Sequence, residues 1–188
     1  IYQAEDRERV KQNAELLHVA NLRKALEQEQ FALYCQPIKP LSETAKATEC
    51  QHYELLRRLI DSQGNARPPR AFIPAAERYG LMGAIDKWVI RTLLSQYKML
   101  LNSAADILIA INLSGNSLTD DSLLEFVRQQ LSASNIVPER LCFEISETAA
   151  VSNLTQASRF IAEMKKIGCR VALDDFGSGL SSFAYLKY

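Results

Sequence analysis

Acidic and amide side chains recur in or near the apolar runs of this sequence. These residues are Glu54, Asn112, Glu144, Glu147, Asp174 and Asp175. Carboxylate and amide oxygens are the ligands that hard cations such as Mg²⁺, Mn²⁺ and Ca²⁺ prefer. Burying several carboxylates without partners is costly, and divalent cations would offset that cost. The pattern indicates a metal site, and two neighbouring cations would suit phosphoryl or phosphodiester chemistry.

Each acid taken alone has a simpler interpretation as a helix cap, a turn residue or an ion-pair partner. Asp174 and Asp175 would point to opposite sides of a regular strand, and both can reach one site only at a strand end. Four separate strand ends that each supply an oxygen ligand favour the metal site over the simpler interpretation. The residue pattern by itself therefore predicts a metal-dependent α/β enzyme.

The elements that must position these side chains follow from hydrophobic periodicity. Apolar runs predict strands near 31–35, 52–56, 107–112, 140–145 and 169–174. Helical spacing predicts helices over 81–101, over 119–131 with Thr119 as N-cap, and over 153–166 with an end at Gly168. Residues 62–70, which contain a glycine and two prolines, are expected to be irregular. Alternating strands and helices predict a parallel sheet covered by helices, whose strands share one carboxyl edge.

Composition and charge exclude several classes of protein. Hydrophobic residues make up 47% and charged residues 23% of the 188 residues, which is typical of a globular domain. Lys and Arg (22) balance Asp and Glu (22), so no overall field would attract a nucleic acid polymer. Four scattered cysteines and two histidines argue against a zinc site and favour reduced core thiols. We expect a cytoplasmic domain, whether the parent protein is soluble or anchored through segments outside this sequence.

Six segments carry a resemblance to a known family. They are YCQPI (34–38), ELLRRL (54–59), FIPAAERYGLM (72–82), INLS (111–114), FEISE (143–147) and ALDDFGSGLSSFAYL (172–186). In order and spacing, the chain from Phe31 onward resembles the EAL domain, the bacterial cyclic di-GMP phosphodiesterase module. Leu55 replaces the alanine of the signature tripeptide, and Ser146 replaces a common threonine. Because Glu54 is kept, we expect these changes to tune the site rather than remove it.

The resemblance implies a fold, a reaction and a set of site residues. The fold would be a TIM-type (β/α)8 barrel with an antiparallel first strand. The reaction would be hydrolysis of cyclic di-GMP to linear pGpG with Mg²⁺ or Mn²⁺ in a two-metal site, and Ca²⁺ would inhibit. The metal ligands would be Glu54, Asn112, Glu144, Asp174 and Asp175, with Asp174 as the bridge.

Three further residues receive roles from the same resemblance. Glu147 would hold the loop 177–182, which would link metal occupancy to dimerisation. Gln36 would contact a guanine base, and Arg58 would bind a phosphate through its guanidinium fork. We therefore expect cyclic di-GMP as the substrate and a homodimer formed through this domain.

The resemblance also suggests a domain organisation. Residues 1–30 are expected to be a helical linker whose start is similar to the end of a GGDEF domain, and residues 31–188 the N-terminal portion of the EAL domain. The parent would then be a tandem GGDEF-EAL signalling protein that can carry sensor domains upstream. Only five of the eight barrel strands are expected here, so the 188 residues alone are expected to be inactive. The alternative is an inactive EAL module that binds cyclic di-GMP or a partner protein.

Overall fold

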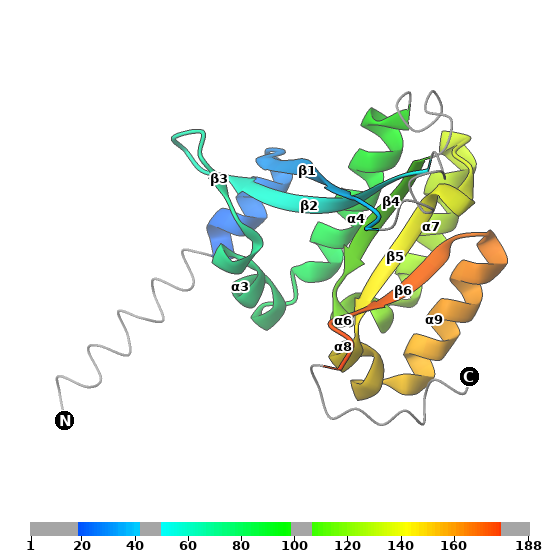
Figure 1. Cartoon of the computed structure of the whole chain (residues 1–188). Helices are drawn as coiled ribbons and strands as arrows, with labels where there is room; N and C mark the ends of the chain where they lie inside the picture. Colours follow the sequence, from blue (N-terminus) through cyan, green and yellow to red (C-terminus); the bar gives the residue numbers. More distant parts are fainter. Residues whose placement is uncertain (1–18, 42–49, 99–106, 178–188) are drawn as a thin grey trace, which may run out of the picture.

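A single mixed sheet organises the computed structural model, which describes residues 19–41, 50–98 and 107–177. The strand order is β1-β2-β4-β5-β6, and the short strand β3 pairs with β2 beside this path (Figure 1). The strands are β1 (Phe31–Ile38), β2 (Gln51–Ile60), β3 (Ala66–Arg67), β4 (Ile107–Leu113), β5 (Leu141–Ser146) and β6 (Arg170–Asp174).

The strand directions are those of a barrel whose first strand is reversed. β1 pairs with β2 antiparallel, whereas β2, β4, β5 and β6 follow one another in parallel. The central strand β4 is buried along almost its whole length, as expected for a parallel strand covered on both faces. The predicted α/β class and the antiparallel first strand are confirmed, and the barrel is incomplete within the described residues.

Three long helices cover one face of the sheet. They are α4 (Met82–Gln96), α7 (Asp121–Ser134) and α9 (Leu154–Ile167). α4 packs against α7, and α7 packs against α9, so the helices form a layer outside the strands (Figure 1). The helix 19–27 precedes β1 and buries Val19, Leu22 and Ala25. In the described part of the chain, every helix is too short or too polar to cross a lipid bilayer.

The helix α4 shows why periodicity was informative. The apolar side chains that recur at helical spacing along it are all buried: Met82, Ile85, Trp88, Val89, Leu93 and Leu94. The shorter helix α3 (Ile73–Arg78) has Pro74 in its first turn and is followed by Gly80, whose φ of 68° ends the segment. α4 ends at Gln96, earlier than the predicted 101, and residues 99–106 lie outside the described chain.

Aromatic contacts fasten the first strand to the helices. The ring centroids of Phe31 and Phe72 are 5.4 Å apart, and those of Phe31 and Trp88 are 5.5 Å apart. Phe143 on β5 meets Phe160 on α9 edge to face at 6.3 Å. Such contacts add to the hydrophobic stabilisation of buried rings, and they fix β1 and β5 against their covering helices.

Two local predictions were wrong for the same reason. The N-cap of α7 is Asp120, which accepts from the Ser122 amide, whereas Thr119 ends the short helix α6 (Gly115–Leu118). Residues 62–70 are not wholly irregular, because they contain β3 and part of the 3₁₀ helix η1 (Pro69–Ala71). Asp61 organises this segment by accepting from the Gln63 and Asn65 amides and from Arg67 Nε. Short side-chain hydrogen bonds of this kind are not visible in hydrophobic periodicity.

Two further short elements were not predicted. They are η2 (Pro138–Arg140) and α8 (Glu147–Ser152). The early part of the predicted linker helix lies outside the described residues.

The cysteines are free, and only two of them are core residues. Cys142 and Cys169 are buried, while Cys35 is exposed on the edge strand β1. Burial, with smaller effects of Glu139 and Cys142, raises the pKa of the Cys169 thiol to about 12. The expectation of a reduced core thiol therefore holds for these two residues and is wrong for Cys35, because among the described strands β1 pairs with β2 alone.

Candidate functional site

Glu54 and Asn112 meet at the centre of the sheet. Asn112 Nδ2 donates a hydrogen bond of 2.8 Å to Glu54 Oε1. In the parallel pairing of β2 with β4, Glu54 stands opposite Ala110, and Asn112 follows two residues later on the same face. Both side chains are half-buried. Two neighbouring strands thus direct an amide and a carboxylate at one point.

The next two strands continue this arrangement. Glu144 stands opposite Asn112, and Asp174 follows two residues after Ala172, the partner of Glu144. In an eight-stranded barrel of shear 8, residues of alternate strands that lie at the same height along the barrel axis are offset by about two residues from the hydrogen-bonded register. By this rule Glu54 and Glu144 share one layer of inward side chains, and Asn112 and Asp174 share the next. The register therefore stacks the four predicted ligands in two successive layers.

The pKa of Glu144 responds to burial and to two neighbouring acids. Burial raises the pKa of Glu144, and the negative charges of Glu54 and Asp174 raise it further. Neighbouring carboxylates disfavour one another's ionised form. A cation bound among them would relieve this repulsion.

This repulsion predicts that Glu144→Gln stabilises the metal-free protein at neutral pH. Because the pKa of Glu144 is raised in the folded state, that state binds more protons above the unfolded pKa of about 4.3. The free energy of unfolding therefore falls as pH rises through the folded pKa, and the penalty is complete above it. Glu144→Gln should raise the Tm in EDTA at pH 7 by about 1–3 °C, with no gain at pH 3.

Glu163→Gln is the matched control for that melting experiment. The pKa of Glu163 is lowered by its hydrogen bond to Lys166 and by nearby cations, so its ionised form is favoured by folding. Glu163→Gln should therefore not raise the Tm at pH 7. If the Tm at pH 7 rose for both variants, or for neither, the conclusion that charge repulsion at Glu144 destabilises the metal-free protein would be contradicted.

The donor set fits a hard divalent cation by its chemistry. Every candidate ligand is a carboxylate or an amide, which offers oxygen atoms. Within residues 19–41, 50–98 and 107–177, no three acidic, histidine or cysteine side chains are already gathered at coordinating distance. Asn112 presents Nδ2 to Glu54, and a half-turn of its amide would present Oδ1 in the same place. A bound cation would therefore draw together the oxygen donors that neighbouring strands already place on one face of the sheet.

The end of β6 places Asp174 and Asp175 outside regular strand geometry. Asp174 Oδ1 accepts from the Asp175 amide at 2.8 Å, and Asp175 has a φ of 53°. A positive φ is uncommon for a non-glycine residue and is often found at functional sites. The strict alternation of side chains ends here, which allows the two acids to face one site. That Asp174 would bridge two metal ions and Asp175 would bind one of them stays a prediction.

Glu147 ties the start of α8 to the turn after β6. Its side chain is buried, with 1% exposure, and its Oε2 accepts from the Gly177 amide at 2.6 Å. Ser146 caps α8 by accepting from the Ala149 amide. Gly177 is the first residue of the loop that Glu147 is predicted to hold; residues 178–182 lie outside the described chain, so this role stays a prediction.

Gln36 and Arg58 lie on the acid-bearing face of the sheet, Gln36 beside Glu54 and Arg58 farther along β2. Gln36 stands directly opposite Glu54 on β1 and is exposed. Arg58 is four residues beyond Glu54, about 13 Å along the strand. Its guanidinium lies 5.3 Å from the centre of the Tyr34 ring, an arrangement typical of a cation–π contact. The two predicted substrate residues therefore flank the acids on one side.

Sequence reasoning missed a buried ion pair behind the site. Arg57 Nη1 lies 2.5 Å from Asp86 Oδ1, and the Asp86 side chain is fully buried. The sequence signal for this pair was weak. Arg57 shares one face of β2 with Leu55 and Leu59, and Asp86 interrupts the apolar stripe of α4. A single charge on an apolar face does not reveal its partner on another element.

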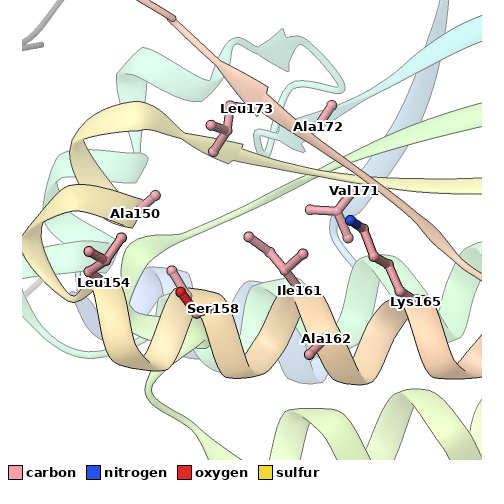
Figure 2. Close-up of a pocket in the computed structure, with 10 residues that line it drawn as sticks. Ala150, Leu154, Ser158, Ile161, Ala162, Lys165, Val171, Ala172 and Leu173 are labelled. Carbon is pink, nitrogen blue, oxygen red and sulfur yellow. The ribbon is translucent and has the colours of Figure 1, made fainter. Parts of the chain in front are cut away.

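The cavity drawn in Figure 2 has none of the candidate acids in its lining. It holds about 400 Å³ between α9 and β6. Leu154 and Ile161 on α9 and Val171 and Leu173 on β6 contribute apolar side chains, and Lys165 stands at one end. The cavity lies on the helix-bearing side of an edge strand, where α/β sheets carry covering helices. Its apolar lining gives it no part in the candidate chemistry.

Comparison with known proteins identifies the family. The cyclic di-GMP phosphodiesterase PdeB of Shewanella oneidensis is 36% identical over 187 residues, which cover 100% of this chain and 22% of that protein. The FimX EAL domain from Pseudomonas aeruginosa, solved bound to c-di-GMP, superposes with a TM-score of 0.78 at 35% identity and covers 90% of this chain and 66% of that one. The PaMucR phosphodiesterase in its c-di-GMP complex gives a TM-score of 0.78 at 30% identity, covering 91% and 68%.

The chain thus spans about a fifth of its curated relative and two thirds of the solved domains. The family model described as "EAL domain" matches residues 19–188. The chain therefore belongs to the EAL domain family.

Proposed function

We propose that the parent protein hydrolyses cyclic di-GMP to linear pGpG in a metal-dependent reaction of bacterial second-messenger signalling. The observation that supports the proposal is that Glu54, Asn112, Glu144 and Asp174 lie on successive parallel strands. Asn112 donates a hydrogen bond to Glu54, and the charges of Glu54 and Asp174 add to burial in raising the pKa of Glu144. Support comes from PdeB, which is named a cyclic di-GMP phosphodiesterase. The two solved EAL domains named above contain c-di-GMP.

The proposed roles at the centre follow the position of each side chain. Glu54, Asn112, Glu144, Asp174 and Asp175 would hold two Mg²⁺ or Mn²⁺ ions, with Asp174 shared between them. Such ions, when bound, lower the pKa of water and stabilise the leaving oxygen. The five side chains would fix the position of the scissile phosphodiester and keep it in line with the attacking oxygen. Ca²⁺ accepts looser geometry at the same oxygens, so we propose that it inhibits.

The substrate would lie across the face that carries Gln36 and Arg58. Gln36 can donate to and accept from the edge of a guanine base. Arg58 can form paired hydrogen bonds with a phosphate, and the Tyr34 ring beneath it restricts where the guanidinium points. These two residues would set the affinity for the nucleotide while the acids carry out the reaction.

Arg58→Ala should raise the KM for cyclic di-GMP by at least about 10-fold with a smaller effect on kcat. A hydrogen bond to a charged group contributes about 1.5–3 kcal/mol, which corresponds to this range. Initial rates at saturating Mn²⁺ would measure both constants. Arg128→Ala is the matched control, because Arg128 pairs with Glu163 on the outer helices. An unchanged KM for Arg58→Ala would remove Arg58 from the binding site.

A second function, nucleotide binding without hydrolysis, is favoured by one observation. The FimX EAL domain is described by the ligand it binds, and binding needs fewer of the acids than hydrolysis does. The full-length parent, assayed with Mn²⁺, with EDTA and with Ca²⁺, separates the two functions. We expect pGpG release with Mn²⁺ only. Tight cyclic di-GMP binding with no pGpG under any condition would establish the binding function instead.

We propose the wider organisation on the basis of the family. Residues 1–30 would be a helical linker from a GGDEF domain to the EAL domain at 31–188, with sensor domains in cis and a cytoplasmic location. Homodimerisation would involve the loop that Glu147 helps to hold through Gly177. Curated relatives are several times longer than this chain, which leaves room for such domains. Size measurement of the full-length protein with and without Mn²⁺ tests the dimer.

A further inference from the structure

A fully satisfied polar network lies between the sheet and α4, behind the candidate site. It joins Arg57 of β2 to Asp86 of α4, and their residue exposures are 8% and 0%. Asp86 Oδ1 accepts from Arg57. Asp86 Oδ2 accepts from the Ser114 amide at 2.9 Å, from Ser114 Oγ at 2.7 Å and from Ser117 Oγ at 2.6 Å. The network therefore connects two strands, a long helix and the start of α6.

Both ends of this ion pair hold the backbone next to Asn112. Arg57 Nη2 donates to the Asn112 carbonyl at 3.2 Å, and Asp86 accepts from the amide of Ser114, two residues later. The pair thus binds the backbone of β4 on both sides of Leu113, at the Asn112 carbonyl and the Ser114 amide. The strand ends here and α6 begins. The Asn112 side chain leaves the opposite face of the sheet and contacts Glu54. Fixing this backbone fixes the direction in which the amide points.

Stability alone does not account for the network. An apolar pair of similar volume is often as stable as a buried ion pair, because desolvation offsets the attraction. Polar pairs can instead select one arrangement of the chain. Here the arrangement selected is the end of β4, which carries a candidate metal ligand.

We propose that Arg57 and Asp86 are positioning residues that orient Asn112 for a divalent cation. This inference rests on the proposed metal site and extends it to two residues on the other side of the sheet. Neither residue touches the substrate or the cation. They act by holding the backbone at Asn112, which fixes the direction of the Asn112 side chain.

The shape of the arginine fork makes the proposal testable. One guanidinium nitrogen reaches Asp86 while another reaches the Asn112 carbonyl. A lysine ammonium is a compact charge on a flexible stem and lacks this fork. Arg57→Lys should therefore keep the pairing with Asp86 and loosen the hold on Asn112. Asp86→Asn should loosen the other end.

The experiment measures Mn²⁺ binding to the full-length parent protein by isothermal titration calorimetry. Loss of an outer partner of a metal ligand typically costs 10–100-fold in metal affinity. We expect Arg57→Lys and Asp86→Asn to weaken Mn²⁺ binding about 10-fold, at a temperature where circular dichroism shows both variants folded. KM for cyclic di-GMP at saturating Mn²⁺ should stay within about twofold.

Asp120→Asn is the matched control. It removes the charge of an aspartate that pairs at 2.8 Å with Lys87 of α4, the helix that also carries Asp86, and asparagine keeps the N-cap of α7. Its Mn²⁺ affinity should equal that of the unsubstituted protein. Should Asp86→Asn fail to fold, Arg57→Lys and Ser117→Ala, which removes one hydrogen bond to Asp86, decide the question.

The outcomes distinguish this inference from the proposed function. Unsubstituted protein that binds Mn²⁺ and a folded Arg57→Lys variant that binds it equally well would overturn the positioning role alone. Unsubstituted protein that binds no Mn²⁺ would overturn both proposals. Weaker binding for Arg57→Lys with unchanged binding for Asp120→Asn would support the role, since a purely structural residue would lower the Tm without this difference.

Discussion

Glu54→Gln in the full-length parent should reduce Mn²⁺-dependent release of pGpG by at least about 1,000-fold, which corresponds to roughly 4 kcal/mol of transition-state stabilisation. The substitution preserves side-chain volume and leaves an oxygen that can still accept from Asn112 Nδ2. It removes one negative charge from the group that raises the pKa of Glu144. The loss of activity would therefore come from weaker cation binding rather than from a disturbed fold. Chromatographic quantification of pGpG at saturating nucleotide measures the effect.

Glu125→Gln is the control for this substitution. Glu125 accepts a hydrogen bond from Gln129 on the exposed surface of α7. This helix lies in the layer that covers the sheet, and the candidate ligands lie on the strands. Its pGpG release should match that of the unsubstituted protein. If Glu54→Gln kept more than a tenth of the activity, Glu54 would not be a metal ligand of the reaction.

Asp86→Ala is the substitution expected to destabilise the fold most among the polar residues discussed. It would leave the Arg57 guanidinium buried without its partner, and breaking a buried pair typically costs about 3–5 kcal/mol. Three further donors, from Ser114 and Ser117, would lose their acceptor. The Tm of the EAL domain within the full-length protein should fall by roughly 10 °C, measured by differential scanning calorimetry.

Two variants show whether the cost comes from the unpaired charge. Arg57→Met combined with Asp86→Leu should recover much of the lost Tm, because no charge is then left buried. Asp121→Ala removes an exposed partner of Arg159 and should cost less than about 1 kcal/mol. An Asp86→Ala protein that melts within 2 °C of the unsubstituted one, on the order of the effect of one surface pair, would contradict the account of this network.

The main elements of the fold could be predicted because their signals are local. β4 and β5 are continuous apolar runs, and α9 is amphipathic and ends at Gly168, whose φ is 101°. The elements that were missed are short and depend on single side-chain contacts. Asp120 rather than Thr119 caps α7 because its carboxylate reaches the Ser122 amide, a choice that both residue types allow.

The candidate site was only partly predictable. The acids stand out because they lie in or beside apolar runs, and the parallel topology then brings the ends of those runs to one edge. The register that pairs Asn112 with Glu144 and brings Asn112 to Glu54 is a property of the folded sheet. Arg57 and Asp86 are 29 residues apart on different elements, so their contact has no local signature.

A crystal of the full-length parent grown with Mn²⁺ and cyclic di-GMP would test the central claim most directly. Anomalous scattering from manganese would locate each bound ion. The account predicts manganese density at the carboxyl ends of the strands, coordinated by oxygens of Glu54, Asn112, Glu144 and Asp174. Manganese bound elsewhere, or nucleotide bound across this face with no manganese among these four residues, would contradict it.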